Sequence, residues 1–137
     1  MDWIFNGKPF NWDDYKDHFG YVYVITNLKT NQKYIGRKYF KAKKVIQKNL
    51  KKSKISVESN WRSYWGSSDK LKQDIETFGK ENFKREILAI GKTIGVVNYL
   101  EVHLQFYFNV LMSNDYINDN IGGKYFRDLI STYPEKT

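Results

Sequence analysis

The chain has 137 residues, of which 41% are hydrophobic and 28% charged, and its net charge is +8. This length suits one domain and is too short for two ordinary ones, and the composition is typical of a globular protein rather than a disordered one. No apolar run reaches the roughly 18 to 20 residues of a membrane span, and no basic segment followed by an apolar one opens the sequence, so we expect a cytoplasmic protein. The absence of cysteine excludes disulfides and thiolate metal sites, and with two histidines it argues against a structural zinc site.

Residues 1–19 mix aromatic side chains with aspartates, and we interpret them as an N-terminal arm that packs onto the domain. The segment 21–26 is β-branched and aromatic, which predicts a buried strand. Turn-forming residues follow at 27–32, and residues 33–36 resume an extended pattern. The sequence therefore predicts a β-hairpin.

The most basic part of the chain follows this predicted hairpin. Nine lysines and arginines and no acidic residue lie between Arg37 and Lys54, while the rest of the chain has 14 basic against 15 acidic residues. Such a segment attracts a polyanion, because each phosphate that it neutralises releases counterions, and the aromatic residues in and after it favour a nucleic acid. The alternative is a solvated lysine loop. We expect the segment to be partly helical, with a short extended piece at 55–57.

Two helices and a strand are predicted beyond the basic segment. Ser67, Ser68 and Asp69 supply capping side chains ahead of a helix at 70–78, and Gly79 is placed to end it. A third strand is expected at 83–90.

From residue 93 to 112, apolar side chains recur at spacings of three and four. These are Val97, Leu100, Leu104, Phe108 and Leu111. The pattern predicts an amphipathic helix on the core. A polar loop follows at 114–123, and we expect the tail beyond it to be dispensable.

Two tripeptides on the predicted hairpin resemble a known motif. Tyr21-Val22-Tyr23 and, after ten residues, Tyr34-Ile35-Gly36 are similar to the pair that names the GIY-YIG nucleases, with Tyr21 in place of the first glycine. A Trp-Arg-x-Tyr segment at 61–64, a serine-capped helix and a glutamate on a long helix then follow in the order of that family. The resemblance extends over residues 20–123 and is closest to phage-encoded, free-standing homing-type endonucleases.

This resemblance implies a metal-dependent endonuclease that hydrolyses DNA phosphodiester bonds, either homing-like or genome-degrading. It implies an α/β (α+β) fold, with a small three-stranded antiparallel sheet flanked by helices and the basic segment 37–60 inserted after the second strand. We expect one domain over residues 1–137, with 1–19 as the arm and 20–123 as the catalytic core. Double-stranded DNA is the expected partner, no membrane is involved, and a homodimer is one arrangement that the sequence leaves open.

Two alternatives use the same fold. One is a non-catalytic nucleic-acid-binding protein, and the other is a structure-specific repair or recombination nuclease. A pure binder has no need of a lone carboxylate among cations, so the presence of Glu101 together with Tyr23, Tyr34 and Arg62 argues against the first.

The resemblance also implies roles for single residues. Tyr23 and Tyr34 are expected on one face of the hairpin, and one of them, Tyr23 by a small preference, takes a proton from the attacking water. A phenol with a pKa near 10 needs nearby cations or a metal-bound water for this role, and the alternative is that both are core aromatics. Arg37 and Arg62 would offset the charge that the phosphate gains, although Arg37 can also be read as a surface arginine.

Glu101 lies beside the apolar stripe of the predicted helix, where a carboxylate is costly unless something compensates it. The resemblance makes it the sole protein ligand of Mg²⁺ or Mn²⁺, and the alternative is a solvated glutamate at the helix edge. Asn120 resembles the asparagine that braces the site, Asn118 is its alternative, and His103 is expected to be structural. The candidate catalytic residues are Tyr23, Tyr34, Arg37, Arg62, Glu101 and Asn120, and the candidate DNA-binding residues are Lys38, Lys41, Lys43, Lys44, Lys51, Lys52, Tyr64 and Lys70.

Overall fold

The predicted hairpin is confirmed by strands β3 (Gly20–Asn27) and β4 (Lys33–Tyr39) of the computed structural model, which describes residues 2–130. β3 pairs antiparallel with β4 on one side and with β7 (Phe83–Gly91) on the other. All eight residues of β3 are buried because it lies in the middle of the sheet. This position explains why its sequence is a continuous apolar run rather than an alternating one.

The sheet is larger than the three strands that the sequence predicts. The N-terminal arm adds β1 (Ile4–Phe5) and β2 (Lys8–Pro9), which give the strand order β2-β1-β7-β3-β4. β1 runs parallel to β7, so the sheet is not purely antiparallel. A 3₁₀ turn, η1 (Trp12–Asp14), follows the two short strands. The arm packs onto the domain as expected, because the buried Trp3 donates a hydrogen bond from Nε1 to the Trp61 carbonyl at 2.9 Å.

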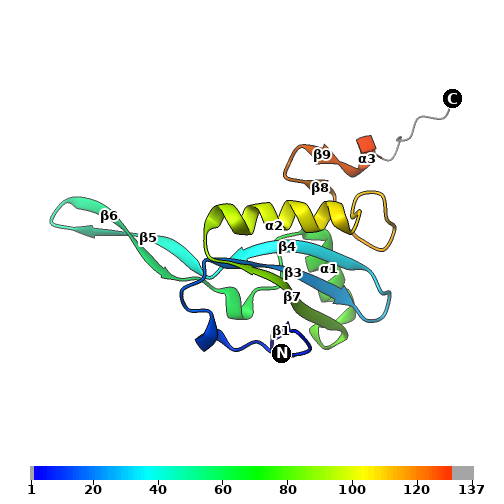
Figure 1. Ribbon diagram of the computed structural model, residues 1–137, viewed down its shortest axis with the longest axis horizontal. Helices are drawn as coiled ribbons and strands as arrows, with labels where there is room; N and C mark the ends of the chain where they lie inside the picture. The colour runs from blue at the N-terminus through cyan, green and yellow to red at the C-terminus, as the bar shows by residue number, and fades with distance from the viewer. Residues whose placement is uncertain (1, 131–137) are drawn as a thin grey trace.

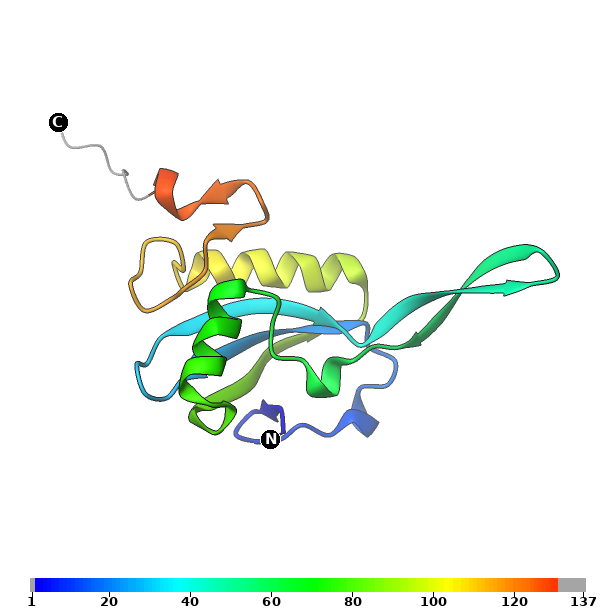
Figure 2. The same ribbon diagram turned by 180° about the vertical axis from the view of Figure 1, so that it is seen from behind.

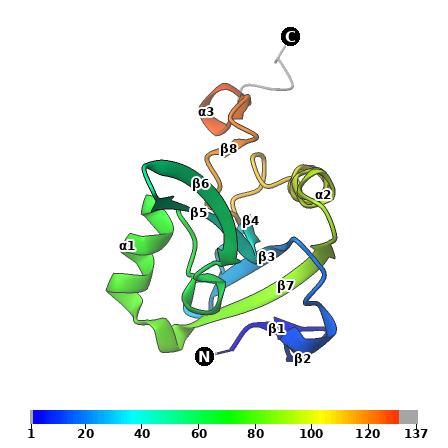
Figure 3. The same cartoon turned by 90° about the vertical axis from the view of Figure 1, so that its left-hand side faces the viewer.

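Two helices cover opposite faces of this sheet, as Figures 1 and 3 show. α1 (Asp69–Phe78) begins after Ser68, whose hydroxyl accepts from the Leu71 amide, and ends at Gly79, whose φ is 86°. α2 (Ile94–Tyr107) begins after Thr93 and is shorter than the predicted 93–112. The chain leaves the helix at Asn109, which has a left-handed φ of 55°.

Each face of the sheet has its own hydrophobic core. Alternate residues of β3 point to opposite faces, as a strand requires. On the α1 face the buried cluster comprises Trp3, Tyr21, Tyr23, Ile25, Phe40, Trp61, Leu71, Phe83 and Ile87. On the α2 face it comprises Val22, Val24, Ile35, Val110, Leu111 and Ile121. The predicted stripe of α2 is therefore correct in part, since Phe108 lies beyond the helix and is 38% exposed.

The basic segment forms a β-hairpin, so the expectation of a partly helical segment is wrong. β5 (Lys41–Lys48) and β6 (Lys51–Glu58) pair along their whole length and project away from the sheet, as Figures 1 and 2 show. We call residues 41–58 the ribbon. Fourteen of its sixteen strand residues are exposed. Its turn, Asn49-Leu50, has two positive φ angles of 51° and 66°, as a two-residue hairpin turn requires.

The chain returns from the ribbon through a short 3₁₀ turn, η2 (Trp61–Ser63), and another, η3 (Lys80–Asn82), precedes β7. Beyond α2 lie β8 (Asn120–Ile121), β9 (Tyr125–Phe126) and α3 (Arg127–Ile130). None of the helices in residues 2–130 combines the length and the apolar character that crossing a membrane demands.

The segment after Gly123 contains Arg127, whose side chain contacts the loop that follows α2. Its guanidinium donates hydrogen bonds of 2.6 to 3.1 Å to four backbone carbonyls. The four acceptors belong to Val110, Ser113, Tyr116 and Asn118. The expectation of a dispensable tail is therefore wrong for this residue, because it holds the loop that follows α2.

Candidate active site

A cleft of about 1060 Å³ lies beside β4, the edge strand of the sheet. Its walls come from β3, β4, the base of the ribbon, the loop before α1, one side of α2 and the loop after α2. Because β4 has no neighbouring strand on this side, the cleft receives side chains from both faces of the sheet. Tyr23, Tyr34 and Tyr64 come from the α1 face. Arg37, Tyr39 and Glu101 come from the α2 face.

The two motif tyrosines lie on one face of the hairpin, as predicted. Tyr23 is opposite Gly36 in the register of β3 and β4, and the ring centres of Tyr23 and Tyr34 are 6.3 Å apart. Both line the cleft. A Cβ atom at Gly36 would lie 2.5 Å from the Tyr23 hydroxyl oxygen, so a glycine is needed here for Tyr23 to extend across β4.

The two motif tyrosines differ in how deeply they are buried. Tyr23 is 1% exposed, and burial followed by the neighbouring Tyr34 and Tyr64 raises its pKa well above 10. Tyr34 is half-buried, and burial followed by the charge of Glu101 raises its pKa, against a smaller opposite effect of Ser67 and Arg37. Arg37 does favour the phenolate of Tyr34, as the sequence suggests, but the net direction for both tyrosines is upward.

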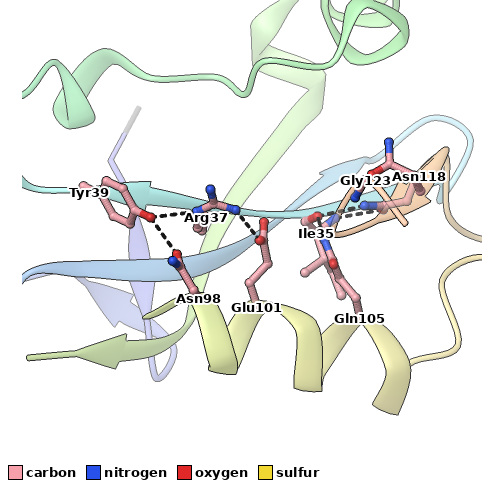
Figure 4. A network of polar contacts seen from close by, with 9 residues as sticks. Ile35, Arg37, Tyr39, Asn98, Glu101, Gln105, Asn118 and Gly123 are labelled. Atoms are coloured by element: carbon pink, nitrogen blue, oxygen red, sulfur yellow. Dashed lines mark hydrogen bonds and ion pairs between the residues drawn. The ribbon is translucent and has the colours of Figure 1, made fainter. Parts of the chain in front are cut away.

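Glu101 and Arg37 form the central ion pair of the cleft, shown in Figure 4. Arg37 Nη1 donates to Glu101 Oε1 at 2.6 Å, and the Glu101 side chain is 11% exposed. The guanidinium is thus the group that compensates this carboxylate in the structure. Burial alone would lower the pKa of Arg37, but the hydrogen bond and charge of Glu101 outweigh burial and raise it.

A chain of hydrogen bonds fixes the Arg37 side chain from its other end. Arg37 Nε donates to the Tyr39 hydroxyl at 3.1 Å, and that hydroxyl donates to Asn98 Oδ1 at 2.6 Å. Asn98 lies three residues before Glu101 on α2, so one helix face holds both ends of the network, as Figure 4 shows. Arg37 and Glu101 are therefore positioned by Tyr39 and Asn98.

Asn118, and not Asn120, braces the edge strand. Its buried side chain accepts from the Ile35 amide at 3.1 Å and donates to the Ile35 carbonyl at 2.8 Å, replacing a neighbouring strand. Gln105 donates to the same carbonyl at 3.0 Å. Asn120 is exposed, borders the cleft, and accepts from the Gly123 amide in a turn. The expectation that Asn120 braces the site is therefore corrected: its alternative, Asn118, makes the bracing contact.

Arg62 lies outside the cleft, contrary to expectation. Its side chain is exposed, pairs with Glu58 at 3.1 Å and lies over the Trp61 ring at 4.5 Å. The backbone at this point is held by the buried Arg85, which donates to the Arg62 and Tyr64 carbonyls at 3.2 and 2.7 Å. The structure thus brings the neighbouring Tyr64 into the cleft and leaves the Arg62 guanidinium on the surface.

The predicted DNA-binding residues fall into two groups. Lys38, Lys41, Lys43, Tyr64 and Lys70 line the cleft, whereas Lys44, Lys51 and Lys52 lie farther out on the ribbon. Lys38 Nζ is 4.2 Å from the centre of the Tyr64 ring, and burial lowers the pKa of Lys38.

Sequence reasoning missed Tyr39, Asn98 and Gln105. A signal for the last two exists, because Asn98, Glu101 and Gln105 recur at spacings of three and four on α2 and share one face. His103 lies on another face, exposed between the stacked rings of Tyr99 and Tyr107. For Tyr39 the signal is weaker, since an aromatic residue in a strand is common.

The cleft residues fit a hydrated divalent cation. Among residues 2–130 no group of three or more His, Cys, Asp or Glu side chains forms a closed metal site. Glu101 is one carboxylate, and one turn away Gln105 has a buried Oε1 atom with no hydrogen-bond partner among the described residues. Mg²⁺ takes one or two carboxylates and keeps several waters, so Glu101 can bind the ion while Gln105 Oε1 accepts from a water.

Comparison with known proteins identifies a family. Residues 3–121 match the family described as "Putative endonuclease segE, GIY-YIG domain". No curated protein and no solved structure matches the chain. The matched region includes both motif tyrosines, Arg37, Glu101 and Asn118.

Proposed function

Because the chain belongs to the GIY-YIG endonuclease family, we propose that it hydrolyses phosphodiester bonds of double-stranded DNA with a divalent cation held by Glu101. The observation that carries this proposal is a buried carboxylate in a cleft lined by Arg37 and four lysines. The negative charge of Glu101 takes up the positive charge of Arg37, so it weakens a protein that only binds DNA. The same charge is useful if it holds a cation next to the phosphate.

Each cleft residue has a separate part in the proposed reaction. The cation, when bound, supplies Lewis-acid polarisation of the phosphate. Arg37 and Lys38 both line the cleft, and the Arg37 side chain is 42% exposed. Their positive charges offset the negative charge that develops on the phosphate. Gln105 orients water through Oε1, and Asn118 keeps β4 in place.

Tyr34 is the better candidate for the group that takes a proton from the attacking water. It is half-buried beside Glu101 and Arg37, whereas the Tyr23 hydroxyl is enclosed over Gly36. This revises the small preference for Tyr23 that the sequence suggests. Since the pKa of Tyr34 is raised, formation of its phenolate depends on Arg37 and on the positive charge of the cation.

The biological setting proposed from the sequence is a phage-encoded nuclease that is homing-like or degrades a competing genome. It rests on the motif variant at Tyr21 and on the order of the motifs. A structure-specific nuclease would share this cleft, and plasmid and branched substrates compared side by side distinguish the two.

The test is plasmid cleavage with Mg²⁺ and with EDTA, for the wild type, Glu101→Gln and the control Glu76→Gln. Glu76 is an exposed carboxylate on α1 and lies outside the cleft. We expect Glu101→Gln to cleave about 10³-fold more slowly or worse, because several kcal/mol of metal-dependent stabilisation is lost. It should bind DNA in EDTA as tightly as the wild type or more tightly. Cleavage by Glu101→Gln within about tenfold of wild type, or undiminished cleavage in EDTA, contradicts the proposal.

A further inference from the structure

The two faces of the ribbon differ in chemistry. In an antiparallel pair, residues directly opposite each other project to the same face, and successive residues alternate. The register therefore divides the ribbon into two sets. One contains Lys41, Lys43, Val45, Gln47, Lys52, Lys54, Ser56 and Glu58, and the other contains Ala42, Lys44, Ile46, Lys48, Lys51, Ser53, Ile55 and Val57.

The first set faces the cleft. Four ribbon residues line the cleft, and three of them, Lys41, Lys43 and Ser56, belong to this set. The fourth, Ala42, lies at the base of the ribbon and belongs to the other set. Farther out, Lys54 and Lys52 lie on the cleft-facing side because they are opposite Val45 and Gln47. Four lysines thus form a line that crosses from β5 at the cleft to β6 near the tip. Along each strand, lysines two residues apart are separated by about 7 Å.

The other face is less suited to a polyanion. Four of its eight residues are apolar, namely Ala42, Ile46, Ile55 and Val57. None of its three lysines lines the cleft, and two of them, Lys48 and Lys51, lie opposite each other at the tip.

We propose that the cleft-facing side of the ribbon binds the phosphates of duplex DNA on one side of the bond to be cut. Lys44 and Lys51, which the sequence suggests as DNA-binding residues, lie on the other side and are not part of this surface. This inference rests on the proposed function and deepens it, since it names a binding surface and makes the footprint asymmetric. Eight residues per strand at about 3.3 Å each extend roughly 26 Å, which spans about eight base pairs.

The exposure of the ribbon agrees with this role. An isolated two-stranded hairpin is marginally stable in water, and this one has fourteen exposed strand residues out of sixteen. A duplex laid against the lysine line compensates charges that otherwise repel one another. Binding of the duplex would therefore stabilise the ribbon.

Two triple variants with equal charge test the inference. Lys43, Lys52 and Lys54→Gln removes three cations from the cleft-facing side, and Lys44, Lys48 and Lys51→Gln removes three from the other side. Binding to a duplex of about 25 base pairs is measured in EDTA over a range of salt concentrations. We expect the first variant to bind about tenfold more weakly or worse, with a salt slope reduced by up to roughly 2.7, and the second to bind within about threefold of wild type. Equal losses in both variants overturn the proposal, because net charge alone then explains binding.

A second test leaves the charge unchanged. The chain has no cysteine, so Ser56→Cys on the cleft-facing side and Ser53→Cys on the other side each introduce a single thiol on an exposed ribbon position. Both variants are alkylated with iodoacetamide with and without the duplex. We expect duplex DNA to protect Cys at position 56 and to leave Cys at position 53 reactive. Equal protection, or protection of position 53 alone, overturns the assignment of the face.

The two proposals fail in different ways. If the binding tests succeed and no cleavage occurs with Mg²⁺, the ribbon surface stands and the nuclease proposal falls. If Glu101→Gln abolishes cleavage and both triple variants bind alike, the nuclease proposal stands and the ribbon surface falls.

Discussion

The ribbon and the rest of the molecule, which we call the body, differ in charge and in the burial of their side chains. The ribbon has seven lysines and one glutamate, so it contributes six of the eight net positive charges, whereas the body is close to neutral. In the body, Tyr23, Glu101 and Asn118 are buried, Glu101 pairs with Arg37, and Asn118 bonds to the backbone of Ile35. Groups that do chemistry need fixed positions, whereas groups that bind phosphates need charge and reach. The difference explains how one short chain can bury the side chains of its cleft and expose those of its ribbon.

The sharpest way to test the body is to remove the hydroxyl of Tyr34. Tyr34→Phe should lower the rate of cleavage by about 10² or more, in line with the loss of a general base, and leave DNA binding unchanged. Tyr23→Phe should lose less, because its hydroxyl is enclosed. Single-turnover cleavage over a pH series checks this, with a rate that rises toward alkaline pH in the wild type and not in Tyr34→Phe. A larger loss in Tyr23→Phe would reinstate the preference drawn from sequence.

Gly36 tests how tightly the body is packed around the motif. Gly36→Ala places a methyl group 2.5 Å from the Tyr23 hydroxyl and 2.9 Å from Tyr34 Cε1. We expect a loss of about 2 kcal/mol in the free energy of unfolding, since overpacking costs roughly 1 to 3 kcal/mol. Urea unfolding measures it. Combining Gly36→Ala with Tyr23→Phe should cost less than the sum of the two changes, and strict additivity would show that the methyl group is accommodated elsewhere.

The buried tyrosines predict a loss of stability at high pH. Burial raises the pKa of Tyr21 and of Tyr23 above the value of the unfolded chain, so between these values the folded state keeps protons that the unfolded state releases. Stability is therefore complete below about pH 10 and falls above it, by about 1.4 kcal/mol per pH unit for each tyrosine. Unfolding curves from pH 8 to 11 check this, with a shallower decline in Tyr23→Phe. An equal decline in that variant assigns the effect to other groups.

The smallest effect on the free energy of unfolding is expected from shortening the ribbon. Replacing residues 43–56 by Asn-Gly joins Ala42 to Val57, which are directly opposite each other, through a two-residue turn. The free energy of unfolding should change by less than about 1 kcal/mol, because the removed residues are almost all exposed. KM for DNA should rise while kcat stays within a few-fold. Unfolding of the body would show that the two regions are not independent.

The parts of the fold that the sequence predicts are those set by local patterns. The apolar run of β3, the cap at Ser68 and the stop at Gly79 depend on neighbours in the chain, and each is found where expected. The sequence does not predict the ribbon as a hairpin, because Val45 and Ile46 are adjacent, fall on opposite faces and break the alternation typical of a strand. The two extra strands of the sheet escape prediction because they are two residues long.

The site shows where sequence reasoning ends. Arg37 and Glu101 are 64 positions apart in the sequence. They form an ion pair only because α2 packs beside β4, which the sequence alone does not reveal. Arg62 lies in a Trp-Arg-x-Tyr segment that resembles the family motif, yet its side chain pairs with Glu58 on the surface and does not enter the cleft. Asn118 and Asn120 are equally good candidates in the sequence, and only their hydrogen bonds, to Ile35 and to Gly123, distinguish them. The catalytic roles themselves stay predictions.

Arg127 has a practical consequence for anyone who wishes to express a shorter protein. Similarity to the family ends at residue 121, and a gene cut there, or after the glycines at 122 and 123, still encodes every cleft residue named above. It would lack the guanidinium that ties together the carbonyls of Val110, Ser113, Tyr116 and Asn118. Since the Asn118 side chain is what occupies the edge of β4 at Ile35, such a fragment would leave that edge free to pair with another molecule and aggregate. A shortened protein should therefore extend at least to residue 130, although the similarity to the family ends at residue 121.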